Sequence, residues 1–126
     1  MISGAITRFI LTSIDSVPHL EAILLLRFDP KVEWDAKTMA QRLYISEKKA
    51  AEVLANLCAA GFVSAKEGGV PLYQYSPVTV DLKEMMDQLA DIYTKNLVEV
   101  TKLIHSKISK QAQQFGDAFR LQSDKE

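Results

Sequence analysis

The first half of the chain alternates apolar patterns of helical period with polar breaks. Residues 4–14 carry apolar side chains at steps of three and four, which predicts a first helix. Residues 17–28 are apolar nearly all round and predict a second helix, central and mostly buried, with Phe28 among its apolar positions. Ser16 can cap this helix, and Pro30 follows its end.

Two shorter helical patterns follow, separated by an interruption at Ile45 and Ser46. Asp35 is a good N-cap for residues 35–44, and the Ser46 hydroxyl can cap the next helix by accepting a bond from an unpaired backbone N–H. Gly61 stands where a left-handed C-terminal cap is favoured. The inward face of the second of these helices comprises Ala50, Val53, Leu54, Leu57 and Cys58. The pattern predicts a helix-turn-helix.

From residue 62 to residue 75 the apolar period shifts towards two, on either side of a turn at Glu67, Gly68 and Gly69. This is typical of a β-hairpin, which would form a wing beside the helix-turn-helix. Residues 31–33 predict a short extended link that pairs beside the wing, with Trp34 closing onto the core.

The second half of the chain predicts one long helix. Asp81 and Glu84 make a capping-box pattern, and apolar steps of three and four then persist for about seven turns without Gly or Pro. Such a helix is longer than a compact core needs, so we expect it to be straight and to pack against a second copy of the chain. The predicted homodimer contacts are Leu89, Tyr93, Leu97, Val100, Ile104 and Ile108.

Beyond Ser109 the sequence turns polar before Phe115 and Phe119, which would share one face of a helix. They either pack on the protein's own body or its dimer mate, or they form a docking segment for another protein.

Three stretches resemble bacterial winged-helix regulators, MarR-like in the broad sense: Trp34–Asp35, Met39–Leu43 and Val53–Val63. The resemblance covers residues 17–77, and the stretch 115–121 is also similar to the end of a group of small, functionally uncharacterised bacterial winged-helix proteins. The resemblance to MarR-like regulators implies a mainly α fold with a small β-hairpin wing. The chain would then divide into a winged helix-turn-helix domain (1–77) and a long C-terminal dimerisation helix and tail (78–126). The resemblance also implies a DNA-binding transcriptional regulator, with room for a ligand pocket between the DNA-binding part and the dimer helices.

A helix of this kind fits the major groove of double-stranded DNA, where side chains near its N-terminus reach base edges. Glu47 and Glu52 oppose this, because carboxylates lower the affinity for a polyanion. The residues predicted to contact DNA are Ser46, Lys48, Lys49 and Asn56, with Lys37, Arg42 and Lys66 holding phosphates.

The charge of the chain leaves a second function open. The net charge is -1 and the sequence pI is about 6.1, whereas nucleic-acid-binding domains are often strongly basic. Residues 31–77 carry six basic and five acidic side chains, a balance of only +1. The alternative is a protein-interaction module that has kept the winged-helix fold without DNA binding and acts through the C-terminal helix and the segment Phe115–Leu121. A positive face that carboxylates interrupt would favour this alternative.

Other chemistry finds little support in the sequence. Cys58 is the only cysteine, and we interpret it as a small core residue. The other interpretation is a redox-sensing thiol. His19 and His105 read as surface or interface residues, since neither stands at metal-ligand spacing from another candidate ligand. No motif indicates an enzyme, a metal site or a cofactor, and no apolar run is long enough for a membrane span. We expect a cytoplasmic protein.

Overall fold

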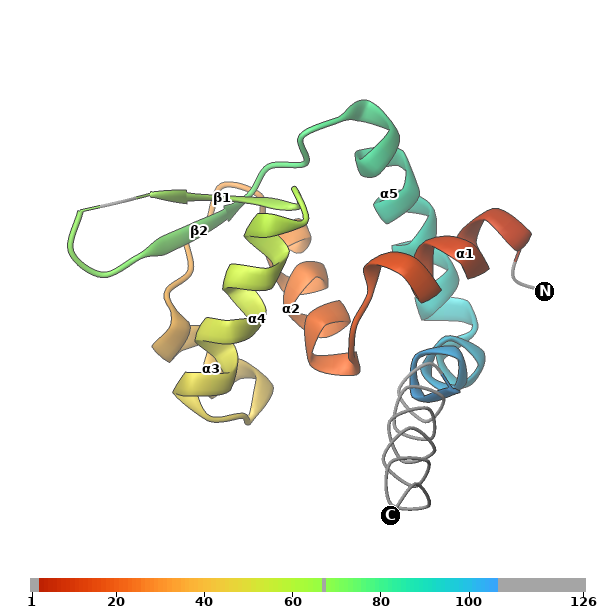
Figure 1. The fold of residues 1–126 in the computed structure, drawn as a ribbon, viewed down its shortest axis with the longest axis horizontal. Helices are drawn as coiled ribbons and strands as arrows, with labels where there is room; N and C mark the ends of the chain where they lie inside the picture. The colour runs from red at the N-terminus through yellow and green to blue at the C-terminus, as the bar shows by residue number, and fades with distance from the viewer. Residues whose placement is uncertain (1–2, 67, 107–126) are drawn as a thin grey trace, which may run out of the picture.

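The computed structural model describes residues 3–66 and 68–106, and Figure 1 shows their arrangement. A helix-turn-helix and a two-stranded hairpin are flanked by helices at both ends of the chain. The elements are α1 (Gly4–Ser13), α2 (Val17–Phe28), α3 (Ala36–Leu43), α4 (Glu47–Ala59), β1 (Val63–Lys66), β2 (Leu72–Tyr75), α5 (Val80–Lys95) and a further helix over 97–106. This arrangement confirms the predicted winged-helix fold class.

Short polar side chains begin the helices, because each accepts a hydrogen bond from a backbone N–H that has no partner within the helix. Asp35 accepts from Thr38 N at 2.7 Å, and Ser46 accepts from Lys49 N at 3.0 Å. Both caps were predictable from the sequence. The predicted capping box at Asp81 is wrong, since Thr79 caps α5 by accepting from Leu82 N at 3.1 Å.

The turn between α3 and α4 depends on one residue in the left-handed region. Tyr44 has φ 56° and ψ 44°, and this reversal lets Ile45 N donate to Ala40 O at 3.1 Å. The chain then leaves α3 sharply, and Ser46 starts α4 directly afterwards. Two short helices are thereby packed against each other as a helix-turn-helix.

The wing is an antiparallel pair in which Val63 faces Tyr75 and Lys66 faces Leu72. Trp34 adds a single bridge beside β2, because its N–H and C=O both bond to Tyr73 at 2.8 Å. The predicted pairing of residues 31–33 beside the wing is wrong, because those residues leave a turn without forming a strand, and among residues 31–35 only Trp34 makes the bridge. The Trp34 bridge fixes the start of α3 relative to the hairpin.

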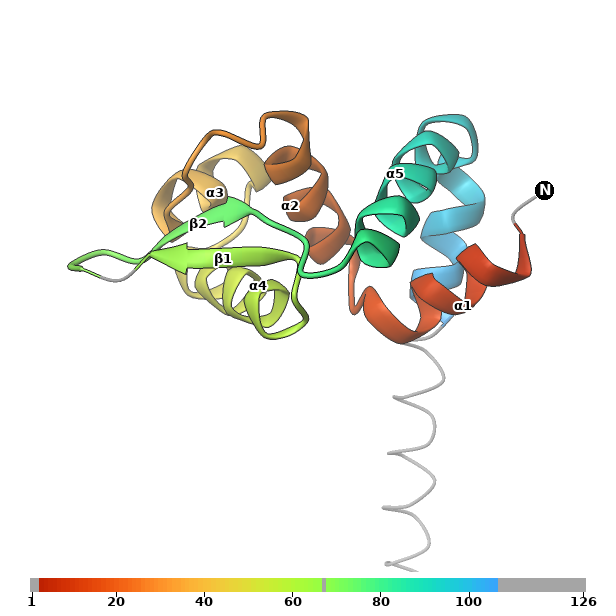
Figure 2. The same ribbon diagram turned by 90° about the horizontal axis from the view of Figure 1, so that it is seen from above.

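The predicted uninterrupted helix after the wing is wrong, because α5 ends at Lys95. Asn96 has φ −133° and ψ 46°, which is not helical, and a new helix begins at residue 97. Asn is a favoured helix N-cap, and Asn96 O accepts from Val100 N at 3.1 Å. The chain turns back at this point, so the 97–106 helix lies beside α5 and α1 (Figure 2).

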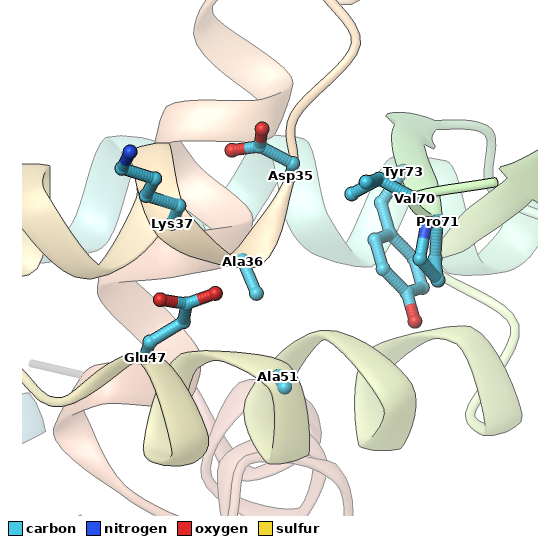
Figure 3. Close-up of a pocket in the computed structure, with 8 residues that line it drawn as sticks. All are labelled: Asp35, Ala36, Lys37, Glu47, Ala51, Val70, Pro71 and Tyr73. Atoms are coloured by element: carbon cyan, nitrogen blue, oxygen red, sulfur yellow. The ribbon is translucent and has the colours of Figure 1, made fainter.

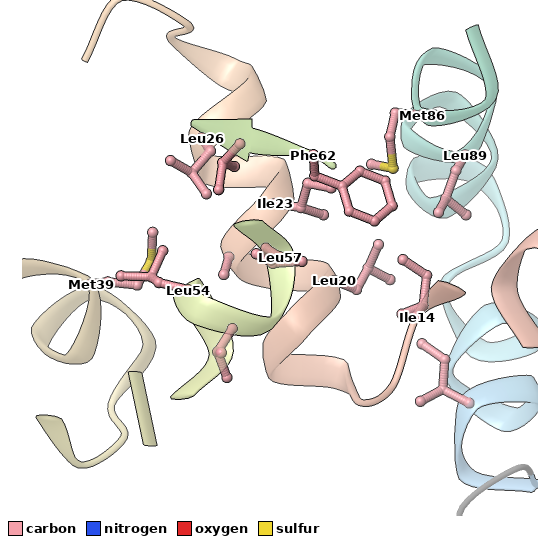
Figure 4. Close-up of a cluster of buried hydrophobic side chains, with 14 of the residues drawn as sticks. Ile14, Leu20, Ile23, Leu26, Met39, Leu54, Leu57, Phe62, Met86 and Leu89 are labelled. Atoms are coloured by element: carbon pink, nitrogen blue, oxygen red, sulfur yellow. The ribbon is translucent and has the colours of Figure 1, made fainter. Parts of the chain in front are cut away.

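Buried side chains from all these helices and from β1 form one continuous cluster (Figure 4). Phe62 packs edge-on against Phe9, with ring centroids 6.1 Å apart, and so connects the wing to α1. Burial of Phe28 was the expectation, but its side chain is 88% exposed. The prediction is wrong because Phe28 is the last residue of α2 and lies beyond the part of that helix that its neighbours cover.

The molecule has two halves that meet along α2 and the start of α5. The helix-turn-helix and the wing lie on one side, whereas α1, α5 and the 97–106 helix lie on the other (Figure 2). Arg27 on α2 donates to Asp87 on α5 at 2.9 Å across this junction. The division of the chain into two domains at residue 77 stays a prediction. In the fold, α1 belongs to the part before residue 77 but lies with α5.

Within the described residues, no single helix is long and apolar enough to cross a membrane, although α1 and α2, bent by 106°, meet the length and composition requirement together.

Candidate nucleic-acid interface

Helix α4 presents two chemically different faces. Ala50, Val53 and Leu54 are fully buried against the rest of the helix-turn-helix. On the opposite face Lys48, Glu52 and Ala55 are exposed, and we call these three residues the crest of α4. The buried face holds the helix in place while the crest stands outward. An outward crest on the second helix of a helix-turn-helix is the geometry that the major groove of DNA accepts.

Ser46 and Lys49 are linked through the first turn of α4. The Ser46 hydroxyl oxygen accepts from Lys49 N at 3.0 Å, so this predicted DNA contact has a structural role at the start of the helix. Lys48 and Lys49 form no ion pair among the residues that the structure describes. Both side chains therefore extend from the first turn of α4, the positive end of its dipole, without a carboxylate partner among those residues.

Asn56, another predicted DNA contact, is engaged within the protein. Its Nδ2 lies 3.1 Å from Nε2 of His19, and Nδ1 of the same ring lies 2.6 Å from the Ser16 hydroxyl. His19 is only 4% exposed, which corrects the expectation of a surface histidine. The sequence placed His19 near its cap, but it gave no signal for a partner 37 residues away. The contact joins α4 to the first turn of α2.

The predicted phosphate ligands differ in how free they are. The Arg42 guanidinium lies over the Trp34 ring, 5.7 Å from its centroid, and Lys66 forms an ion pair with Glu33 at 2.7 Å. Lys37 is exposed and forms no ion pair with any described residue. Glu33 therefore already neutralises Lys66 on the wing, whereas Lys37 on α3 has no carboxylate partner among the described residues.

Carboxylates interrupt the positive face. A hollow of about 350 Å³ separates the wing from the first turns of α3 and α4, and both Asp35 and Glu47 line it next to Lys37 (Figure 3). Hydrogen bonds from the Thr38 hydroxyl and backbone N–H hold the pKa of Asp35 below its ordinary value. Asp35 is therefore ionised at neutral pH, and the strip between α4 and the wing is not uniformly positive.

A second hollow of about 350 Å³ lies between α2 and α3, and its apolar lining consists of Leu24, Leu25, Phe28 and Leu43. Like the first, it is lined by residues of the winged-helix half, not by α5. The ligand pocket that the resemblance implied was expected elsewhere, between the DNA-binding part and the dimer helices, and it stays a prediction.

The residues predicted for the dimer contact divide into two groups. Leu89, Val100 and Ile104 are completely buried within a single chain, because the break at Asn96 folds the 97–106 helix onto the protein's own core. Tyr93 is half-buried and Leu97 is 51% exposed. Ile108 lies outside the described residues, as does the segment 115–121.

Cys58 is half-buried at the edge of the core.

No protein-family model matches the sequence, and neither does any curated protein. Among solved structures, HlyU from Vibrio cholerae is similar, with a TM-score of 0.54 at 20% identity over 75% of this chain and 99% of that one. The PcaV transcriptional regulator from Streptomyces coelicolor is similar with a TM-score of 0.52 at 17% identity, over 95% of this chain and 85% of that one. PcaV in complex with its natural ligand gives a TM-score of 0.52 at 16% identity, over 97% and 84% of the two chains. At these identities the likeness is one of fold, and the chain shares the winged helix-turn-helix fold that its resemblance to bacterial winged-helix regulators implied.

Proposed function

We propose that this protein is a homodimeric DNA-binding transcriptional regulator that inserts α4 into the major groove of double-stranded DNA. The observation that carries the proposal is the exposed crest of α4, which a fully buried opposite face holds rigidly on the winged-helix body. The likeness to the PcaV transcriptional regulator supports the same function. Such a protein would act in the cytoplasm, where bacterial DNA lies.

The proposed contacts follow from which side chains are free. Lys48, Lys49 and Lys37 would bind DNA directly, and Arg42 and Lys66 would hold phosphates after giving up part of their present contacts. Ser46 and Asn56 serve the interface by positioning α4. Direct DNA contact by these two residues stays a prediction.

Dimerisation supplies the affinity that one copy lacks. A single winged-helix part carries little net charge, so its attraction for the phosphate backbone is weak at physiological salt. Two copies that present two α4 helices to successive major grooves double the number of phosphate contacts. We assign the dimer contact to the α1 and α5 half, from which Leu97 stands exposed.

The first test is fluorescence anisotropy of a labelled mixed-sequence duplex at low and moderate salt, with native protein and the Lys48→Glu, Lys49→Glu variant. We expect native binding to weaken steeply with salt and the variant to lose binding, because salt competes with the phosphate contacts of these ammonium groups. A Lys95→Glu, Lys102→Glu variant is the matched control once sedimentation velocity shows that it is as dimeric as the native protein. It makes the same charge change outside the winged-helix half and should bind with only a modest loss. Equal loss in both variants would contradict the assignment of α4.

The carboxylates on the same face favour the second candidate function, a protein-interaction module without DNA binding. Asp35, Glu47 and Glu52 stand among the cations, and Glu33 neutralises Lys66. This module would act through the C-terminal helix and the segment Phe115–Leu121. A folded dimer that binds no duplex even at low salt would favour it over the regulator.

A further inference from the structure

The crest of α4 combines one donor, one acceptor and one methyl group. Lys48 and Glu52 are four residues apart, so they are neighbours on the helix surface with Cβ atoms about 6 Å apart. Both are exposed, and neither forms an ion pair with any described residue. Ala55 lies one turn beyond Glu52 on the same side. These are the side chains that would enter a groove first and deepest.

The ammonium of Lys48 can only donate hydrogen bonds, and the carboxylate of Glu52 can only accept them. In the major groove, guanine offers the acceptors N7 and O6, while the cytosine paired with it offers the N4 amino group as a donor. An A·T pair carries its donor on adenine N6, between the acceptors adenine N7 and thymine O4, with the thymine methyl group beyond O4. The two side chains on the crest therefore complement a G·C pair best, because two neighbouring acceptors meet the ammonium and the donor stands at one end for the carboxylate.

Glu52 also acts by exclusion. A carboxylate in the major groove of a polyanion is unfavourable unless it accepts a hydrogen bond. The donors that base edges offer there are the amino groups of cytosine and adenine. Asn56, the side chain on α4 best suited to adenine, is held by the buried His19. Ala55 offers only a methyl group, which suits the C5-methyl of thymine.

We propose that α4 selects a G·C pair in its binding site, with Lys48 donating to guanine and Glu52 accepting from the paired cytosine, and with a thymine beside this pair against Ala55. Glu52 is thus the specificity-determining residue of the interface, although the same carboxylate weakens binding to DNA in general. The inference rests on the proposed function, since it requires α4 in the major groove.

The test is selection of binding sites from a randomised duplex library with the full-length protein and three variants. Glu52→Ala removes the acceptor, and Glu52→Gln replaces it with an amide that prefers adenine. Glu47→Ala is the matched control, because it removes an equal charge from the same helix at a position off the crest. Affinities for the selected duplex and for single-base variants are then measured by fluorescence anisotropy.

We expect the native protein to prefer one G·C pair over A·T by roughly tenfold, as a well-paired side chain discriminates bases. Glu52→Ala should weaken this preference to what Lys48 alone supplies and tighten binding to unrelated duplexes, and Glu52→Gln should favour adenine where the native protein favours cytosine. Glu47→Ala should tighten non-specific binding in the same way and keep the preference.

Two results would overturn the inference in distinguishable ways. If the native protein binds DNA with a salt-dependent affinity but the Glu52 variants select the same sites, the assignment of Glu52 fails and the proposed function stands. If the native protein binds no duplex at low salt, the proposed function fails, and the assignment of Glu52 fails with it.

Discussion

At the scale of single residues, the contact between Asn56 and His19 adds a polar link between α4 and α2 to the buried apolar face that holds α4. The Asn56 amide lies on the side of α4 that faces α2, and its partner ring is buried at the start of α2. In one arrangement of protons, the neutral ring donates from Nδ1 to the Ser16 hydroxyl and accepts at Nε2 from the Asn56 amide. A polar pair in this position orients α4, because an apolar contact would leave its rotation less defined.

A double-mutant cycle tests this pairing. We expect Asn56→Ala and His19→Ala each to lower the free energy of unfolding, and the double variant to lose about 1 kcal/mol less than the sum, since the second change removes a contact already lost. Urea unfolding followed by circular dichroism gives the three values. The cycle also cancels the gain in helix propensity that alanine brings. Additive losses would show that the two side chains do not depend on each other.

Residue identities alone predicted where α4 lies but not which of its side chains are without partners among the described residues. Lys48 and Lys49 remain unpaired among the described residues, whereas Lys66 meets Glu33, which lies 33 residues away in the sequence. Arg42 lies over Trp34. Such partners are set by tertiary contact, so sequence spacing could not predict them. The carboxylates of Glu47 and Glu52, by contrast, were visible in the sequence as opponents of DNA binding, and both stay exposed.

At the scale of elements, local sequence predicted the helices that carry their own end signals. Ser16, Asp35 and Ser46 cap α2, α3 and α4 as expected, and Gly61 has the positive φ of 88° that a left-handed cap requires. The break at Asn96 escaped prediction because the apolar steps of three and four continue across it. Those steps reflect burial on both sides of a turn, and a helical period cannot distinguish a straight helix from two that fold back on one core.

The junction of α2 and α5 contains a carboxyl group, that of Asp87, whose pKa is lowered by its partners in the fold. Burial alone would raise the pKa of Asp87, but hydrogen bonds from Arg27 and Lys83 outweigh it and hold the pKa below the ordinary value of 3.8. A carboxyl group whose pKa is lower in the folded than in the unfolded chain stabilises the fold fully above the unfolded value. That contribution disappears as the pH falls through the folded value.

We therefore expect Asp87→Asn to lower the free energy of unfolding at neutral pH by less than about 1 kcal/mol, because the side chain is 40% exposed and solvent screens the pair. The native protein and the variant should converge in stability as the pH falls below 3.8. Urea unfolding at a series of pH values measures this. Asp91→Asn is the control, because Asp91 pairs with Lys95 within α5 and not with α2. A difference between native and Asp87→Asn that persists unchanged in acid would contradict the role of this pair.

At the scale of the whole molecule, the fold-back at Asn96 changes how a dimer can form. A long apolar helix suggested a surface that only a second copy could cover, yet Val100 and Ile104 are covered by their own chain. What remains for a partner is the outer side of this half, where Leu97 and Val98 are 51% and 64% exposed. The proposed dimer contact and the hydrophobic core are therefore separate parts of the molecule, and different substitutions should affect each.

This separation predicts opposite behaviour for two leucines in the same half. Leu97→Glu should convert a dimer to monomers at micromolar concentration, because it places a charge in the proposed contact while the core stays intact. Leu89→Ala should lower the free energy of unfolding by about 2–5 kcal/mol through a cavity, since Leu89 is completely buried. Sedimentation velocity measures the first effect and urea unfolding the second, with Val70→Glu on the wing as an exposed apolar control.

Leu97→Glu and its control Val70→Glu also connect assembly to DNA binding. If two copies are needed to present two α4 helices, monomeric Leu97→Glu should bind a duplex with lower affinity and with a salt dependence about half as steep, because half of the phosphate contacts remain. Val70→Glu should stay dimeric, so that any loss of binding it shows comes from the charge on the wing. A native protein that sediments as a monomer and still binds DNA with the full salt dependence would contradict the dimer and would leave α4 to act from a single copy.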